Sequence, residues 1–199
     1  MDGRIIAAAA LAALAAGWVW LMRRPAKRAL APRGAKMLFV GDSMLEGLEP
    51  RLRARAAAAG VAYTGKWKRG ARIATWAGEE DLRLALQQGP SACVIVLGTN
   101  DAALADPGAE RDELRTLVLE CSEATGVPVL WIDPPQTPFD GDAALMQMLA
   151  EASSTLPMRR FATRDLDLVR AGDGIHLTMS AYGQWADAIW RWMEAQRVT

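Results

Sequence analysis

Histidine is almost absent from this sequence, which contains a single one, His176, in 199 residues. Any mechanism that needs an imidazole as a proton carrier near neutral pH must therefore use that residue. Cysteine is nearly as scarce, with two residues. Two cysteines exclude a fold built on disulfides and fall short of the four ligands of a structural zinc site. We therefore expect no metal centre.

Net charge is absent as well, because 23 Lys and Arg balance 23 Asp and Glu. A neutral total gives no sign of a nucleic-acid-binding surface, so no nucleic-acid partner is expected. The balance is uneven along the chain. Residues 1–36 carry seven basic and one acidic residue, and the other 163 residues carry 16 basic and 22 acidic ones. A hydrophobic fraction of 51% at this length predicts one folded domain.

Charge is missing altogether from residues 5–22, IIAAAALAALAAGWVWLM. As a helix this segment would span roughly 27 Å, close to the hydrocarbon thickness of a bilayer. A cleaved signal peptide would become polar where residues 18–22 stay apolar, and a buried helix of a soluble domain would show a polar face. We therefore predict a membrane anchor in residues 1–22, a basic tether in residues 23–36 and a folded domain in residues 37–199.

Short apolar runs alternate with helix-like segments from residue 37 onward. The strongest strand pattern is ACVIVLG at 92–98, which is typical of a central parallel strand covered on both faces. Other strands are predicted at 37–40, 61–67 and 127–133, with a weaker one near 160–165. Helices are predicted at 45–59, 79–88, 110–124, 143–154 and 178–196. This alternation predicts an α/β fold with a parallel sheet.

Functional residues of such sheets gather at the carboxyl ends of the strands. Ser43 follows the first strand; it could cap the next helix, or it could be a nucleophile beside helix-start N–H groups that stabilise an oxyanion. Asn100 follows the central strand and could donate to an oxyanion or close a turn. Gly70, after the second strand, could offer its N–H or allow a positive φ.

The single histidine lies in G-D-G-I-H-L-T, three residues after Asp173. A short turn at this spacing lets the Asp173 carboxylate hold one ring nitrogen while the other nitrogen faces a nucleophile as general base. The alternative is an ordinary surface histidine in a turn. An ordinary imidazole titrates near ~6.5, so a mechanism that depends on it loses activity below about that pH.

Taken together, these blocks resemble the SGNH hydrolases, also called GDSL-like esterases and lipases. The resemblance runs over about residues 37–196. The first block is Gly41-Asp42-Ser43, the glycine block is Gly70, and the third and last blocks are Gly98-Thr99-Asn100-Asp101 and Asp173-Gly174-Ile175-His176. The resemblance implies a flavodoxin-like, three-layer α/β/α fold. It also implies a catalytic triad of Ser43, His176 and Asp173, with an oxyanion hole formed by the N–H groups of Ser43 and Gly70 and the Asn100 side chain.

The function that follows from the resemblance is a serine esterase, or an acyltransferase with the same residues, acting on short O-acyl esters of a carbohydrate or lipid. Arg72, Pro134 and Phe139 lie on loops after strands and are candidate substrate contacts, with a solvated basic loop and a rigid turn as the alternatives. A second hypothesis is a catalytically silent SGNH-like module that binds glycan at the membrane. A flavodoxin-like cofactor protein would need a Gly-rich phosphate loop after the first strand, so no cofactor is expected.

The expected partners are therefore an ester substrate and, through residues 5–22, a membrane. Two indications disagree about the side of the membrane on which the folded domain lies. Six Lys and Arg residues follow the apolar segment within residues 1–36 and one precedes it, which by the positive-inside rule places the domain in the cytoplasm. Acylated carbohydrates and similar substrates more often lie outside the cytoplasm. The sequence leaves the side of the membrane open.

Two other patterns predict structural roles. Four residues recur at helical spacing and predict a buried stripe: Trp185, Ile189, Trp192 and Met193, with Tyr182 one turn earlier. Trp190 falls off that face and is predicted to be exposed. Cys93 in the central strand and Cys121 in a helix are predicted to be small buried hydrophobic residues.

Overall fold

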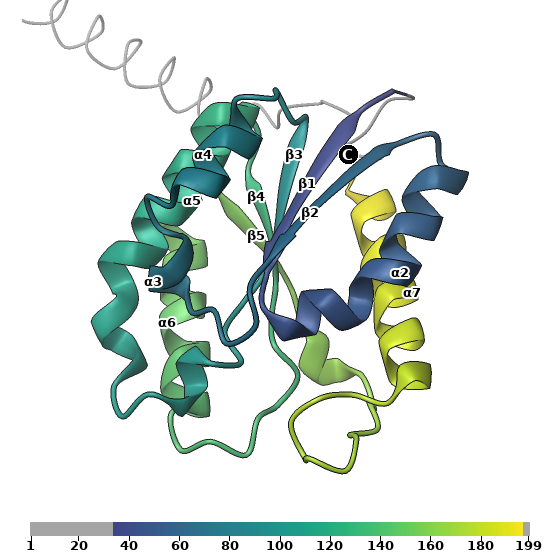
Figure 1. Ribbon diagram of the computed structural model, residues 1–199. Coiled ribbons are helices and arrows are strands. Elements are labelled where there is room, and N and C mark those ends of the chain that lie inside the picture. The colour runs from purple at the N-terminus through teal and green to yellow at the C-terminus, as the bar shows by residue number, and fades with distance from the viewer. Residues whose placement is uncertain (1–33, 197–199) are drawn as a thin grey trace, which may run out of the picture.

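A five-stranded sheet forms the centre of the computed structural model, which describes residues 34–196 (Figure 1). The strands are β1 (Lys36–Gly41), β2 (Ala62–Trp67), β3 (Ala92–Val96), β4 (Val129–Ile132) and β5 (Met158–Phe161). Their order is β2-β1-β3-β4-β5, and every neighbouring pair is parallel. All five carboxyl ends therefore lie at one edge of the sheet.

Helices cover both faces of the sheet. α2 (Ser43–Ala58) and α7 (Met179–Ala195) lie on one side, and α3 (Ile73–Trp76), α4 (Glu80–Leu86), α5 (Arg111–Thr125) and α6 (Asp142–Thr155) lie on the other (Figure 1). Three 3-10 turns complete the described part: η1 (Asp101–Ala103), η2 (Pro107–Glu110) and η3 (Thr163–Asp165). This three-layer α/β/α arrangement confirms the predicted fold class of the domain.

The sequence of β1 shows how one strand serves two cores. Met37 and Phe39 belong to the core beneath α2 and α7, and Leu38 and Val40 belong to the core on the opposite face. Alternate side chains of a strand point to opposite faces, so a strand covered on both sides must be apolar at every position. That requirement explains the continuous apolar pattern from which β1 and β3 were predicted.

Two local predictions are wrong. The fifth strand is Met158–Phe161 rather than 160–165, and residues 163–165 form η3. Its apolar signal is interrupted by Arg160, whose guanidinium forms a two-pronged ion pair with the buried Asp133 carboxylate at 2.9 and 2.8 Å. Trp190 is buried rather than exposed, because its ring joins the core beneath α7 and its Nε1–H donates to Glu194 at 2.8 Å.

The predicted anchor and most of the predicted tether lie outside the described residues. Within residues 34–196, the structure contains no helix that is both long and apolar enough to cross a membrane. The anchor in residues 1–22 stays a prediction. The described chain begins at Gly34, close to the amino end of β1, which is the edge of the sheet opposite the carboxyl ends of the strands.

Gly41 fixes the turn from β1 into α2. A Cβ at this position would lie 2.6 Å from the Leu45 Cβ and 2.7 Å from the Val96 carbonyl oxygen. Because the Val96 oxygen belongs to the backbone of β3, relief requires the end of β1 to move relative to β3. We expect Gly41→Ala to lower the free energy of unfolding by about 1–3 kcal/mol, measured by urea denaturation.

Gly183→Ala is the matched control for this substitution. Gly183 lies inside α7 and has no heavy atom within 4 Å of an added Cβ. Alanine in a helix is favoured over glycine by up to about 1 kcal/mol, so this variant should be unchanged or more stable. Equal destabilisation by both variants would contradict the role assigned to the Gly41 contact.

Candidate active site

Ser43 lies at the carboxyl edge of the sheet as the first residue of α2. The helix is capped by its neighbour, because the Asp42 carboxylate accepts a hydrogen bond from the Met44 N–H at 2.8 Å. The Ser43 hydroxyl is therefore not needed as a cap. Its Oγ lies 2.9 Å from Nε2 of His176, 133 residues later in the chain.

The His176 loop, residues 170–178, holds the imidazole and its carboxylate partner. Nδ1 of His176 lies 2.6 Å from Oδ2 of Asp173, and the other Asp173 oxygen accepts the N–H groups of Ile175 and His176 at 2.9 Å each. The hydrogen bond from His176, with support from the two backbone N–H groups, lowers the pKa of Asp173 to about 2. Asp173 therefore stays ionised across the physiological range and favours a proton on Nδ1 of the ring.

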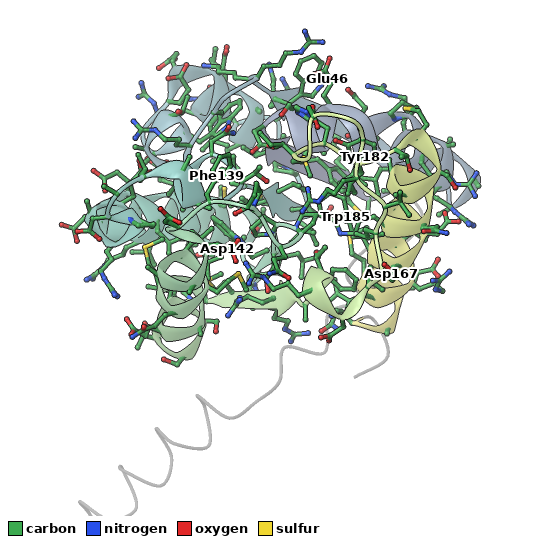
Figure 2. The ribbon with its side chains drawn as sticks, turned by 90° about the horizontal axis from the view of Figure 1, so that it is seen from below. Glu46, Phe139, Asp142, Asp167, Tyr182 and Trp185 are labelled. Carbon is green, nitrogen blue, oxygen red and sulfur yellow. The ribbon has the colours of Figure 1, made fainter. Side chains whose placement is uncertain are left out.

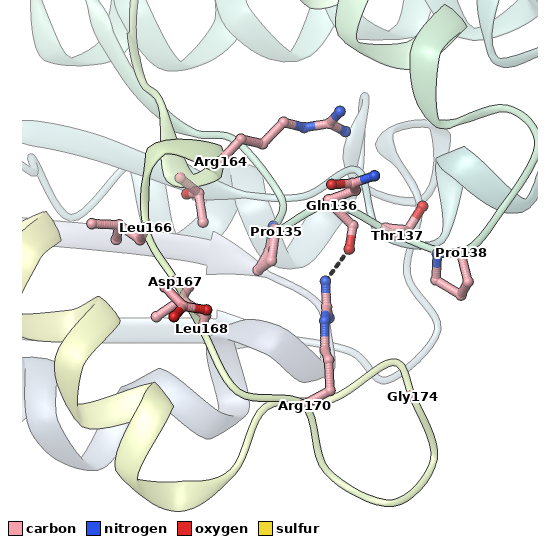
Figure 3. A pocket seen from close by; sticks show the side chains of 11 residues that line it. Pro135, Gln136, Thr137, Pro138, Arg164, Leu166, Asp167, Leu168, Arg170 and Gly174 are labelled. Carbon is pink, nitrogen blue, oxygen red and sulfur yellow. Dashed lines mark hydrogen bonds between the residues drawn. The ribbon is translucent and has the colours of Figure 1, made fainter.

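Arg170 connects this loop to a second one. Its guanidinium donates to the Ile175 carbonyl and to the Gln136 carbonyl, and the second bond is drawn in Figure 3. Burial lowers the pKa of Arg170. A cavity of about 400 Å³ lies beside it, between residues 135–138 and residues 164–170. The loop before α6 and the His176 loop are thus held together beside the candidate site.

A cavity of about 520 Å³ opens directly over Ser43 and His176. Figure 2 looks onto this edge of the molecule and shows Phe139 on the α6 side and Tyr182 on the α7 side. The cavity is lined by Ser43, Glu46, Gly47, Arg69, Gly70, Thr99, Asn100, Phe139, Ile175, His176 and Tyr182. Its walls are mixed, since they include the aromatic rings of Phe139 and Tyr182 and a charged pair formed by Arg69 and Glu46 at 2.6 Å.

Two residues that line this cavity, Ser43 and Gly70, carry backbone N–H groups that can serve as donors. Gly70 has a φ of +73°, and its N–H donates no hydrogen bond to any other group within residues 34–196. The Ser43 N–H lies in the first turn of α2, where helical N–H groups have no partner inside the helix. Free N–H groups at a helix start form a site for negative charge.

Asn100 also lines the cavity, but its amide hydrogens already have acceptors. Nδ2 donates to Oδ2 of Asp42 and to the Ala71 carbonyl, each at 2.9 Å. An amide nitrogen carries two hydrogens, so both are used in this geometry. Asp42 is fully buried, and burial raises its pKa to about 7 despite the hydrogen bonds that it accepts.

The three predicted substrate contacts lie in different surroundings. Phe139 lines the cavity over Ser43, whereas Arg72 and Pro134 are not among the residues that line it. Arg72 instead pairs with Glu110 at 3.2 Å, and Pro134 is buried against Gly98. Within residues 34–196, no three His, Cys, Asp or Glu side chains are grouped so that they could hold a metal ion.

Tyr182 is buried in the core beneath α7, as predicted, and it also lines the cavity, which the sequence pattern did not indicate. Its ring packs on Gly47, where an added Cβ would lie 2.3 Å from the ring. Tyr182 follows His176 by six residues, in the first turns of α7. That proximity to the single histidine was the signal that could have placed it at the site.

No protein-family model matches the chain, and no curated protein sequence matches it. Solved structures do. The esterase EstA from Pseudoalteromonas sp. has a TM-score of 0.63 at 19% identity, covering 78% of this chain and 94% of EstA. A catalytic mutant of Axe2, an acetylxylan esterase from Geobacillus stearothermophilus, has a TM-score of 0.61 at 19% identity. The match covers 82% of this chain and 95% of Axe2.

A protein from Parabacteroides merdae, described as a GDSL-like lipase, has a TM-score of 0.62 at 13% identity. The match covers 85% of this chain and all of that protein. Identities this low show the fold rather than the function. The chain has the fold of the GDSL-like lipases and SGNH esterases, as the resemblance of its sequence blocks to that family implied.

Proposed function

We propose that this protein is an SGNH-type serine esterase with Ser43 as nucleophile, His176 as general base and Asp173 as the carboxylate that orients the imidazole. The observation that carries the proposal is the hydrogen-bonded chain from Ser43 Oγ through His176 to Asp173, with distances of 2.9 and 2.6 Å. These groups come from the two ends of the domain and meet at the wall of a cavity. A serine hydroxyl joined to an imidazole and a carboxylate in this order is an activated nucleophile.

The reaction follows from this geometry. His176 Nε2 takes the proton of Ser43 Oγ as the oxygen attacks an ester carbonyl, and the Asp173 carboxylate stabilises the imidazolium. The imidazolium then protonates the departing alcohol, which leaves an acyl group on Ser43. Water, activated by His176, releases the acid in the second half. An acceptor hydroxyl in place of water would make the same site an O-acyltransferase.

The negative charge of the tetrahedral intermediate would be stabilised by the N–H groups of Ser43 and Gly70, two residues that line the cavity. The Asn100 amide can contribute only when one of its two present hydrogen bonds is exchanged for the oxyanion. Bonds of this kind commonly rearrange when substrate binds. We propose all three groups as oxyanion donors, with Asn100 the one that must rearrange.

The cavity supports short acyl groups as substrates. A volume of about 520 Å³ is that of a small-ligand site, and the acyl group must share it with the alcohol portion. Phe139 and Tyr182 offer apolar walls, while Arg69 and Glu46 offer polar groups that suit a hydroxylated alcohol such as a carbohydrate. The similar structure Axe2 is an acetylxylan esterase. A panel of p-nitrophenyl esters from acetyl to palmitoyl, together with acetylated sugars, tests this choice.

We also propose that residues 5–22 anchor the enzyme in a membrane as a single-pass segment, for the reasons of length and composition given above. The side that the domain faces follows from protease accessibility in intact and permeabilised cells. Digestion of the domain in intact cells would place it outside the cytoplasm. Digestion of the domain only after permeabilisation would support a cytoplasmic domain, which the basic tether favours. A control must show that the membranes of the intact cells exclude the protease.

A fluorophosphonate probe distinguishes the esterase from the alternative, a catalytically silent glycan-binding module. We expect the probe to label the parent protein, and to label neither Ser43→Ala nor His176→Ala. Ser154→Ala, at an exposed serine on α6, is the control and should be labelled like the parent. Unlabelled parent protein would favour the silent module, and labelling of Ser43→Ala would overturn the assignment of the nucleophile.

A further inference from the structure

The Gly70 loop, residues 68–72, is held by side chains from two other segments. The Ala71 carbonyl accepts a hydrogen bond from Asn100 at 2.9 Å. The two residues that follow the loop begin α3, and each donates its backbone N–H to a carboxylate. The Ile73 N–H donates to Oδ1 of Asp101 at 2.9 Å, and the Ala74 N–H donates to Oε2 of Glu110 at 2.8 Å. The position of Gly70 therefore depends on Asp101 and Glu110, although neither lines the cavity over Ser43.

The far end of α3 joins this loop to the nucleophile. The indole Nε1–H of the buried Trp76 donates to the Gly41 carbonyl at 3.1 Å, two residues before Ser43. A displacement of α3 would therefore act on both proposed backbone donors, at Gly70 directly and at Ser43 through the turn after β1. Hydrogen bonds therefore hold α3 at both ends, to the two carboxyl groups at its start and to the β1–α2 turn at its end.

The two carboxyl groups are buried side by side. Asp101 is fully buried and Glu110 is 6% exposed. Within residues 34–196, Oδ2 of Asp101 has no hydrogen-bond partner, and its neighbour Glu110 accepts the Ala74 N–H. Two carboxylates can form a hydrogen bond with each other only when one carries a proton. Burial raises the pKa of Asp101 well above its ordinary value, and the neighbouring Glu110 carboxyl group raises it further.

Other charged groups act on the pair unequally. Arg72 Nη1 lies 3.2 Å from Oε1 of Glu110 and forms an ion pair with that carboxylate. The negative charge of Asp42, across the loop, raises the pKa of Asp101. On α5, one turn after Glu110, the Glu113 carboxylate also has a buried oxygen without a hydrogen-bond partner in the described part of the chain. The shared proton is therefore placed on Asp101, whose Oδ2 has no partner among the described residues, while Glu110 is paired with Arg72.

We propose that Asp101 and Glu110 act as a singly protonated carboxyl pair that positions the Gly70 N–H for the oxyanion. They are positioning residues, since neither touches the reacting atoms. The inference rests on the proposed esterase function. It adds a prediction that the function alone does not make: activity falls at alkaline pH when the pair loses its proton, because two adjacent buried anions then repel each other and release the start of α3.

The test is the pH dependence of p-nitrophenyl acetate hydrolysis by the full-length protein in detergent, with the rate of Ser43→Ala subtracted. We expect Asp101→Ala and Glu110→Ala to lower kcat about 10- to 100-fold with KM within about threefold, because a displaced oxyanion donor acts on the transition state. Glu123→Ala, at an exposed carboxylate on α5, is the matched control and should follow the parent at every pH.

The variant Asp101→Asn distinguishes two roles of the carboxyl pair: positioning of Gly70 through a shared proton, and structural support that needs no proton. The amide keeps an acceptor for the Ile73 N–H and a permanent donor toward Glu110, so it imitates the protonated carboxyl. We expect kcat of this variant at neutral pH to recover to within about threefold of the parent, and the alkaline fall to disappear. An unchanged alkaline fall in Asp101→Asn would overturn the shared proton, and a parent-like kcat in both alanine variants would overturn the positioning role.

Labelling by the fluorophosphonate probe, measured on the same samples, keeps the two proposals apart. Absence of labelling and hydrolysis in the parent would contradict the proposed function itself. A labelled and active parent, with carboxyl variants that behave like it, would contradict this inference alone.

Discussion

Ser43→Ala is expected to lower kcat/KM for p-nitrophenyl acetate by about 10⁴-fold or more while leaving the fold unchanged. The hydroxyl is the proposed nucleophile, and no other serine lines the cavity at His176. The stability of the variant should stay within about 0.5 kcal/mol of the parent, because Asp42 rather than Ser43 caps α2. Steady-state kinetics and urea denaturation measure the two quantities.

A residual rate is expected in this variant, since the oxyanion donors and the cavity remain in place. His176→Ala should lose about as much as Ser43→Ala, and the double variant should lose little more, because the two residues act as a unit. Ser154→Ala serves as the control here as well. Hydrolysis by Ser43→Ala within tenfold of the parent would remove Ser43 from the mechanism.

The fold was predictable because its signals are local. Strands covered on both faces must be apolar throughout, so β1, β3 and β4 are each visible as short runs, and the amphipathic helices between them complete the α/β pattern. β5 was misplaced because its sequence lacks such a continuous apolar run. Its Arg160 looks unfavourable in a strand until Asp133, 27 residues earlier, supplies its partner in space.

In the candidate site, too, contacts between residues close in sequence were predictable and contacts between distant residues were not. Asp173 and His176 are three residues apart, so their contact follows from a short turn, and Ser43 could be placed by its position after β1. The engagement of Asn100 by Asp42 could not be predicted, because the two residues are 58 positions apart. Nor could the pairing of Arg72 with Glu110, which turned a candidate substrate contact into part of the support for the Gly70 loop.

The buried cysteines show a further limit of sequence patterns. Cys93 and Cys121 are both buried, as predicted, but the sequence did not indicate that they meet. Their sulfur atoms lie 3.2 Å apart, between β3 and α5. Contacts between elements on the same face of a sheet depend on the rotation of each helix about its axis, which hydrophobic periodicity defines only coarsely.

Asp173→Asn is expected to lower kcat by about 10³- to 10⁴-fold with little change in KM. The asparagine oxygen can still accept the N–H groups of Ile175 and His176, so the loop is retained. Its amide nitrogen would face Nδ1 of His176 and donate to it, which moves the ring proton to Nε2. A protonated Nε2 cannot take the Ser43 proton. The effect is therefore on the chemical step, and single-turnover acylation of the enzyme measures it.

The same substitution tests the electrostatics of the loop through stability. The pKa of Asp173 is about 2 in the folded protein, below its ordinary value of 3.8. A lowered pKa means that the ionised form stabilises the fold, and this contribution is present above the ordinary value and lost as pH falls through the folded one. The urea midpoint of the parent should therefore exceed that of Asp173→Asn near pH 6, and the difference should shrink toward about pH 2. A difference that is constant with pH would show that the asparagine acts through packing, and the loss of kcat would then need another cause.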